Sequence, residues 1–228
     1  MSAYYLSILS GALLTVGVSL SALLVAVALG LLGAAAKLSR RRYLVWPATL
    51  YTTVIRGIPE LVLMLLVFYG GSIGLNAMIE AMGSEFAINI EPFTAGVLTL
   101  GFIYGAYMTE TFRGAILSIP QGQLEAAAAF GMRPWQILLR ITLPLMVRYA
   151  LPGVTNNWLV LIKATAVVSL IGLQEMTYLA KQASAATRSP FAFFLFTAAL
   201  FLLYTWASLV VLKQLNQRYS LGVRHGRL

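Results

Sequence analysis

The sequence predicts an all-α membrane protein with five transmembrane helices. Of its 228 residues, 60% are hydrophobic and only 10% are charged, and the mean hydropathy is +0.84. Soluble domains carry about a quarter charged residues. The first 36 residues contain no charged side chain, whereas a helix needs only about 20 apolar residues to cross the hydrocarbon core. Lipid is therefore the main solvent of this chain.

Five apolar stretches are long enough to be spans, and we expect them to form one domain over residues 1–228. No basic residue precedes the first stretch, so it does not look like a cleaved signal and is expected to stay in the mature protein. The predicted spans are 9–36, 57–77, 93–109, 151–173 and 191–212.

The basic residues between these spans predict the orientation. Lys and Arg concentrate on the cytoplasmic side of membrane proteins. The loop after the second span carries only the acidic residues Glu80, Glu85 and Glu91. We therefore expect the N-terminus on the periplasmic side and the C-terminus in the cytoplasm. An odd number of spans agrees with this, because it places the two termini on opposite sides. The basic residues follow spans one, three and five: Lys37, Arg40, Arg41, Arg42; Arg113, Arg133, Arg140, Arg148; and Lys213, Arg218, Arg224, Arg227.

Several functional classes find no support in the sequence. A net charge of +9 would suit a nucleic-acid-binding protein, but here the basic residues are spread between apolar runs, so we expect no nucleic acid partner. No phosphate-binding loop, nucleophile elbow or HExxH motif occurs, and His225 lies in the basic tail. Without cysteine there is no thiolate metal site. We expect neither an enzyme nor a metal protein.

The segment 113–148, between the third and fourth spans, is predicted to be a small folded element on the cytoplasmic side. Pro120 to Gly122 forms a turn, and 123–130 has the composition of a short helix. Gly131 can supply a left-handed cap, and Pro134 can open a second helix. Pro144 is expected to stop that helix before the fourth span.

A motif inside this segment carries the functional prediction. The run Glu125-Ala-Ala-Ala-Ala-Phe-Gly131, followed by Ile141-Thr-Leu-Pro144, resembles the "EAA" motif of binding-protein-dependent ABC permeases. The alternative is a plain surface helix, because alanine has high helix propensity. In the family, this element docks in a groove of a cytoplasmic ATPase. The resemblance implies that role for Glu125, Ala126, Ala127, Gly131, Ile141, Leu143 and Pro144.

Other segments are similar to permeases for polar amino acids. The run 104–114 resembles their "AE-x-x-RG" signature, 56–59 their "RGTP" motif, and 156–165 the start of their fourth span. The resemblance implies the type I ABC importer permease fold, MetI-like, and an importer of basic amino acids such as histidine, lysine, arginine or ornithine. Opines remain an alternative substrate. A stand-alone secondary transporter is a further alternative, but the chain has no internal repeat.

The same resemblance implies the partners. They are two copies of an ABC ATPase, a second homologous permease subunit, a periplasmic amino-acid-binding protein and the lipid of the inner membrane. ATP and Mg would be bound by the ATPase, and this chain would hold no cofactor. The second permease subunit could be identical or different.

Ionisable residues in or near the spans are candidates for the substrate path, because a charge inside a span usually faces a cavity. Glu60 stands where the family usually has an apolar residue, and Ala164 where it often has Asp. Glu60, Glu175 and Lys163 are the path candidates, with structural pairing as the alternative. Glu110 and Arg113 are three residues apart and are predicted to form an ion pair.

Overall fold

The computed structural model describes residues 2–83 and 89–219, and every regular element in these residues is a helix. The helices are α1 (Ser2–Leu38), α2 (Arg42–Gly57), α3 (Glu60–Leu65), α4 (Gly71–Ala81), α5 (Pro92–Leu117), α6 (Gln121–Ala129), α7 (Pro134–Ile137), α8 (Leu143–Ala164), α9 (Met176–Thr187) and α10 (Pro190–Tyr219). π-Helical turns join α3 to α4 and α7 to α8, and a 3-10 helix, Thr165–Ile171, extends α8.

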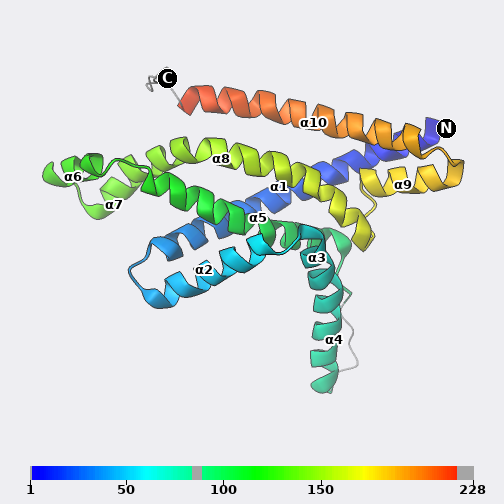
Figure 1. The fold of residues 1–228 in the computed structure, drawn as a ribbon, viewed down its shortest axis with the longest axis horizontal. Coiled ribbons are helices and arrows are strands. Elements are labelled where there is room, and N and C mark those ends of the chain that lie inside the picture. Colours follow the sequence, from blue (N-terminus) through cyan, green and yellow to red (C-terminus); the bar gives the residue numbers. More distant parts are fainter. Residues whose placement is uncertain (1, 84–88, 220–228) are drawn as a thin grey trace.

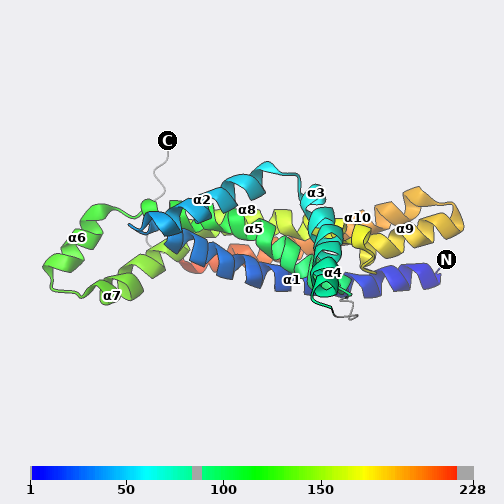
Figure 2. The same cartoon turned by 90° about the horizontal axis from the view of Figure 1, so that it is seen from below.

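The long helices α1, α5, α8 and α10 run along the length of the molecule (Figure 1). The α6–α7 hairpin forms one end of the molecule, while α9 and the start of α1 lie at the other (Figures 1 and 2). Helix α2 turns back at 39–41 and packs on α1 and α5. The sequence did not predict α2, which is more polar than the spans and contains the proline Pro47.

The contact between α1 and α5 is the largest between any two helices and depends on small residues. A β-carbon at Gly30 would lie 2.5 Å from Met108 Cβ, and one at Gly101 would lie 2.5 Å from Val25 Cγ1. The two backbones are therefore too close for larger side chains, as in other small-residue helix contacts in bilayers. In the second half of α1 the buried residues are Ala22, Ala26, Gly30 and Ala34, at intervals of four residues.

Four segments of the described chain are long and apolar enough to cross a membrane: 2–38, 60–81, 134–171 and 190–217. Helix α5, the third predicted span, is not among these four although it is 26 residues long. Its neighbours bury 14 of those residues. Other helices therefore surround much of α5, which leaves less of its surface to face lipid.

The second predicted span is a helical arm that points away from the bundle (Figures 1 and 2). It consists of α3, the π-helical turn Leu66–Gly70 and α4, and no residue of that turn or of α4 is buried. A β-carbon at Gly71 or Gly74 would meet nothing within 4 Å. The arm therefore exposes apolar residues and small residues to its surroundings.

The fourth predicted span begins much earlier than expected, because the helical segment runs from 134 to 171. The expectation that Pro144 stops a helix was wrong. Pro144 lies in the first turn of α8, directly after the π-helical turn Leu138–Thr142. Proline lacks the N–H that an interior helical residue donates, and the first turn of a helix tolerates that loss.

Candidate functional site

The α6–α7 hairpin has the cap and the second helix that the sequence predicted, but the predicted turn Pro120 to Gly122 is wrong, because Gln121 and Gly122 lie in the first turn of α6. Gly131 has φ +77°, its N–H donates to Ala128 O at 2.9 Å, and the N–H of Met132 donates to Ala127 O at 3.1 Å. These are the two hydrogen bonds of a Schellman cap. Pro134 opens α7, as predicted. Helix α6 begins at Gln121, two residues before the expected start.

The exposed face of α6 differs from the expected one at Ala127. Glu125 and Ala126 are exposed, and Phe130 is 90% exposed. Ala127 is only 5% exposed, so its side chain turns into the chain and is not on the surface that a partner would meet. Composition could not reveal this, because Ala126, Ala128 and Ala129 beside it are also alanine.

Beyond the cap, the chain continues as one helical segment into the bundle. The N–H of Arg133 donates to Gln136 Oε1 at 2.8 Å, which ties the start of α7. Ile141 lies in the π-helical turn, and Leu143 and Pro144 begin α8. The predicted coupling residues therefore span the path from the exposed end of the molecule to α8.

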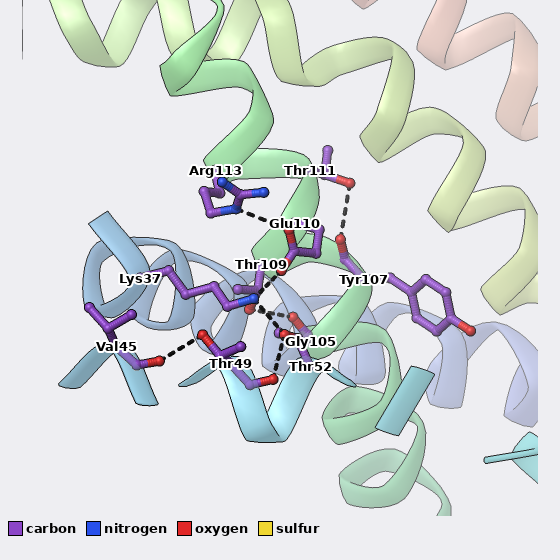
Figure 3. Close-up of polar contacts among 10 residues, drawn as sticks. All are labelled: Lys37, Val45, Thr49, Thr52, Gly105, Tyr107, Thr109, Glu110, Thr111 and Arg113. Atoms are coloured by element: carbon purple, nitrogen blue, oxygen red, sulfur yellow. Dashed lines mark hydrogen bonds and ion pairs between the residues drawn. The ribbon is translucent and has the colours of Figure 1, made fainter. Parts of the chain in front are cut away.

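A charge cluster joins α1, α2 and α5 (Figure 3). Lys37 forms an ion pair with Glu110 and donates to Thr52 Oγ1 at 2.6 Å. Arg113 Nε lies 3.0 Å from Glu110 Oε2, which is the pair that the sequence predicted. The side chains of Lys37 and Glu110 are only 11% and 21% exposed. One carboxylate thus serves two cations from different helices.

A polar cavity of about 610 Å³ opens beside this cluster, between α1, α2 and α5. Arg56 is an exposed residue of its wall, and its guanidinium carbon lies 5.2 Å from the centre of the Tyr107 ring. Among the described residues, Arg56 forms no ion pair with a carboxylate. The wall consists of Lys37, Thr52, Thr53, Arg56, Gly57, Tyr107 and Glu110.

Glu60 lies near the same region, just after the break between α2 and α3. Tyr104 donates a hydrogen bond to Glu60 Oε1 at 2.8 Å. The rings of Tyr104 and Tyr107 are 5.7 Å apart, and Tyr107 contacts Arg56. Two tyrosines of α5 thus connect an acidic residue and a basic residue that flank Gly57 to Pro59.

Glu175 is buried and hydrogen-bonded within the fold. It is 1% exposed and caps the start of α9, where it accepts a hydrogen bond from the N–H of Tyr178 at 2.8 Å. Thr15 of α1 donates a hydrogen bond to its other oxygen at 3.2 Å. Glu175 therefore fixes α9 on α1, and it does not line the polar cavity.

Lys163 is exposed near the end of α8, beside apolar residues of α10 such as Phe201 and Leu202. In the residues that the structure describes, no hydrogen bond or ion pair joins any two of the three path candidates, Glu60, Lys163 and Glu175. The structure instead adds Lys37 and Arg56. The sequence signals for these two residues were their charge at the edge of an apolar run and, for Arg56, its place in the segment that resembles the "RGTP" motif.

The sequence of this chain is similar to those of known transport proteins. Residues 26–221 match the family model described as "Binding-protein-dependent transport system inner membrane component". The chain is 49% identical, over 97% of its length and 96% of the relative's, to the histidine/lysine/arginine/ornithine transport system permease protein HisQ of Escherichia coli K12. It is 39% identical to the octopine transport system permease protein OccQ of Rhizobium radiobacter, over 93% and 90% of the two chains.

A solved structure extends the agreement to the fold. A crystal structure of an amino acid ABC transporter with histidines has a chain that matches with a TM-score of 0.82 and 30% identity. The match covers 96% of each chain. It confirms the predicted importer-permease fold.

Replacing Glu110 with Gln should destabilise the protein, because it leaves Lys37 and Arg113 partly buried without their shared carboxylate. We expect a loss of about 1 to 3 kcal/mol in the free energy of unfolding. The measurement is thermal unfolding of the detergent-purified chain. Glu80→Gln is the matched control, since Glu80 is exposed on α4. Adding Lys37→Met should recover part of the loss, and equal melting temperatures for both glutamine variants would contradict the expectation.

Proposed function

The chain belongs to the family of binding-protein-dependent transport system inner membrane components, and we propose that it is the permease subunit of an ATP-driven importer of basic amino acids. The observation that carries the proposal is the α6–α7 hairpin. It presents a capped helix with an exposed small-residue face at one end of a multi-pass membrane protein, and it continues directly into α8. Such a helix suits a groove on a partner protein.

The proposed partners follow from this function. Two copies of an ABC ATPase bind ATP and Mg and receive α6, while the chain itself performs no catalysis and holds no cofactor. A periplasmic binding protein delivers the amino acid. A second, homologous permease subunit completes the path across the bilayer. The α3–α4 arm supports that last partner, because no residue of α4 is buried against the described part of this chain, and a β-carbon at Gly71 or Gly74 would meet nothing within 4 Å there.

The substrate class rests on two observations. HisQ, which is 49% identical, is named for histidine, lysine, arginine and ornithine. In this chain the acidic residue Glu60 is hydrogen-bonded by Tyr104, whose ring lies 5.7 Å from that of the cavity residue Tyr107. Octopine is a second candidate because the similarity to OccQ also covers most of the chain. Octopine carries more carboxylates than arginine, so uptake assays with both compounds separate the two candidates.

The docking proposal predicts that Ala126→Arg abolishes association with the ATPase. Ala126 is exposed, so the arginine does not disturb the hairpin, but its bulk and charge prevent close contact with a groove. We expect at least about a tenfold loss of ATPase that co-purifies with the chain, equivalent to about 1.4 kcal/mol.

The control for this variant is Ala186→Arg, at an exposed alanine of α9 near the opposite end of the molecule (Figure 1). It should bind the ATPase normally. Ala127→Arg should instead lower the melting temperature, because Ala127 is buried. Normal ATPase binding and normal transport by the Ala126→Arg variant would reduce α6 to a plain surface helix.

The orientation is also a proposal: the N-terminus faces the periplasm, and α6, α7 and the C-terminus face the cytoplasm. The distribution of Lys and Arg supports it. A periplasm-active phosphatase should be active when fused after Glu85 and inactive after Gln217. A fluorescent protein that matures only in the cytoplasm should give the reverse pattern. If the phosphatase is inactive after Glu85 and active after Gln217, and the fluorescent protein gives the opposite pattern, α6 cannot meet a cytoplasmic ATPase.

Replacing Glu60 with Gln should lower the uptake of arginine by roughly tenfold, because a charge-assisted hydrogen bond contributes about 1.5 to 3 kcal/mol. Uptake of glutamine, which has a neutral side chain, should fall much less. The assay is competitive uptake of radiolabelled arginine and glutamine at matched expression. Glu175→Gln should lower both uptakes equally, because Glu175 caps α9. Equal losses for Glu60→Gln would assign Glu60 to the fold as well.

A further inference from the structure

The polar cavity between α1, α2 and α5 has the size of a small-molecule site. Its volume of about 610 Å³ lies within the range of ligand pockets, which is about 300 to 1,000 Å³. Charged groups and hydroxyl groups form much of its wall, whereas the cavity between α1, α8 and α10 is lined almost entirely by apolar side chains. A polar ligand fits the first cavity and a lipid chain the second.

The charges of this cavity leave one cation unpaired. Glu110 is shared by Lys37 and Arg113, so this cluster already carries one excess positive charge. Arg56 adds another, and the described residues place no carboxylate on it. The cavity is therefore suited to an anionic group.

The geometry of Arg56 is suited to a carboxylate in particular. The guanidinium lies over the ring of Tyr107 at 5.2 Å, a contact that holds the side chain in place. Such a contact does not consume the N–H donors, which point outward in the guanidinium plane. Two of these donors match the two oxygens of a carboxylate.

Arg56 shares the cavity wall with Lys37 and Glu110. Lys37 and Arg113, the two partners of Glu110, follow the first and third predicted spans on the side proposed to be cytoplasmic. The cavity therefore lies toward the cytoplasmic ends of these spans, where a substrate on its way into the cell would pass.

An opposite charge lies across the break in the helix. Glu60 follows Arg56 by four residues, and Tyr104 and Tyr107 connect the two sites through ring contact, a hydrogen bond and a cation–π contact. No ion pair joins Arg56 to Glu60 in the part of the chain that the structure describes. A ligand with a carboxylate and a separate cationic group matches this pair.

We propose that Arg56 binds the α-carboxylate of the transported amino acid in this cavity, with the cationic side chain of the substrate directed toward Glu60. The proposal rests on the proposed function and adds a carboxylate-binding residue to it. Arg56 replaces Lys163 in this role, because Lys163 lies beside α10 and does not line the cavity.

The test compares L-arginine with agmatine, which has the same guanidinium and amino groups but no carboxylate. Both are titrated onto the purified complex of the permease and its ATPase, without the binding protein, by displacement of radiolabelled L-arginine. Arg56→Gln should raise the Kd of L-arginine by about tenfold to a hundredfold and leave that of agmatine unchanged. Arg42→Gln, at the other end of α2, should change neither Kd.

Other results would overturn the proposal. An unchanged Kd for L-arginine, or an equal increase for L-arginine and agmatine, would show that Arg56 does not read the carboxylate. A phospholipid phosphate is the other anionic group in reach. It would be identified if phosphatidylglycerol in nanodiscs stabilised the wild type but not Arg56→Gln, while the Kd of L-arginine stayed the same.

A second variant and the activity of the wild-type complex separate a folding defect from a loss of binding. If Arg56→Gln does not assemble with the ATPase, Arg56→Lys serves instead; it keeps the charge but loses the paired donors, so a severalfold increase for L-arginine alone is expected. A wild-type complex that neither binds nor transports any basic amino acid would refute the proposed function itself. If the wild-type complex is active and the Arg56 variants bind L-arginine as tightly as the wild type does, only the proposed carboxylate site is refuted.

Discussion

The close contact between α1 and α5 fixes the position of the site. Apolar helices gain little from leaving lipid for one another, so their association depends on how closely their backbones approach. Gly30 and Gly101 permit that approach, and the alanines of α1 continue it along the helix. Helix α5 is held between α1, α2 and α8 as a result. Tyr104, Tyr107 and Glu110 all project from this one immobilised helix.

The chain accommodates its charges in two ways that have different consequences. Lys37 and Arg113 share the carboxylate of Glu110, and this network connects the end of α1 to α5. Arg56 and Glu60 are not neutralised by such a pair among the described residues, and each contacts a tyrosine instead. In the first arrangement each charged group already has a partner of opposite charge, and these contacts stabilise the fold. The second leaves binding capacity for a ligand, which is why we assign function to it.

Local features of this protein could be predicted from the sequence, and features that depend on distant contacts could not. Gly131 and Pro134 determine only the backbone of the few residues around them. The structure has both in the predicted roles, as the cap of α6 and the start of α7. The pair Glu110–Arg113 is likewise local, but Lys37 joins it from a helix 73 residues away. Helix α2 was missed for a similar reason, since its stability comes from packing on α1 and α5 and not from a run of apolar residues. The direction of the α3–α4 arm is also invisible to hydropathy, which measures composition only.

On the proposed function, the same packing explains how docking at α6 can reach the substrate cavity. The Schellman cap at Gly131 joins α6 rigidly to the helical segment that becomes α8. Asn157 of α8 donates a hydrogen bond to Thr111 of α5 at 3.0 Å, and a β-carbon at Gly153 would lie 2.7 Å from the Thr111 side chain, so the two helices are in close contact there. Thr111 lies one turn from Tyr107, to whose carbonyl it donates. Since closely packed helices cannot slide without disturbing such contacts, a displacement of α6 must either move α5 with α8 or separate them at Asn157. Either movement changes the wall of the cavity that contains Arg56, and this is how ATP hydrolysis in a partner could open or close a site in this chain.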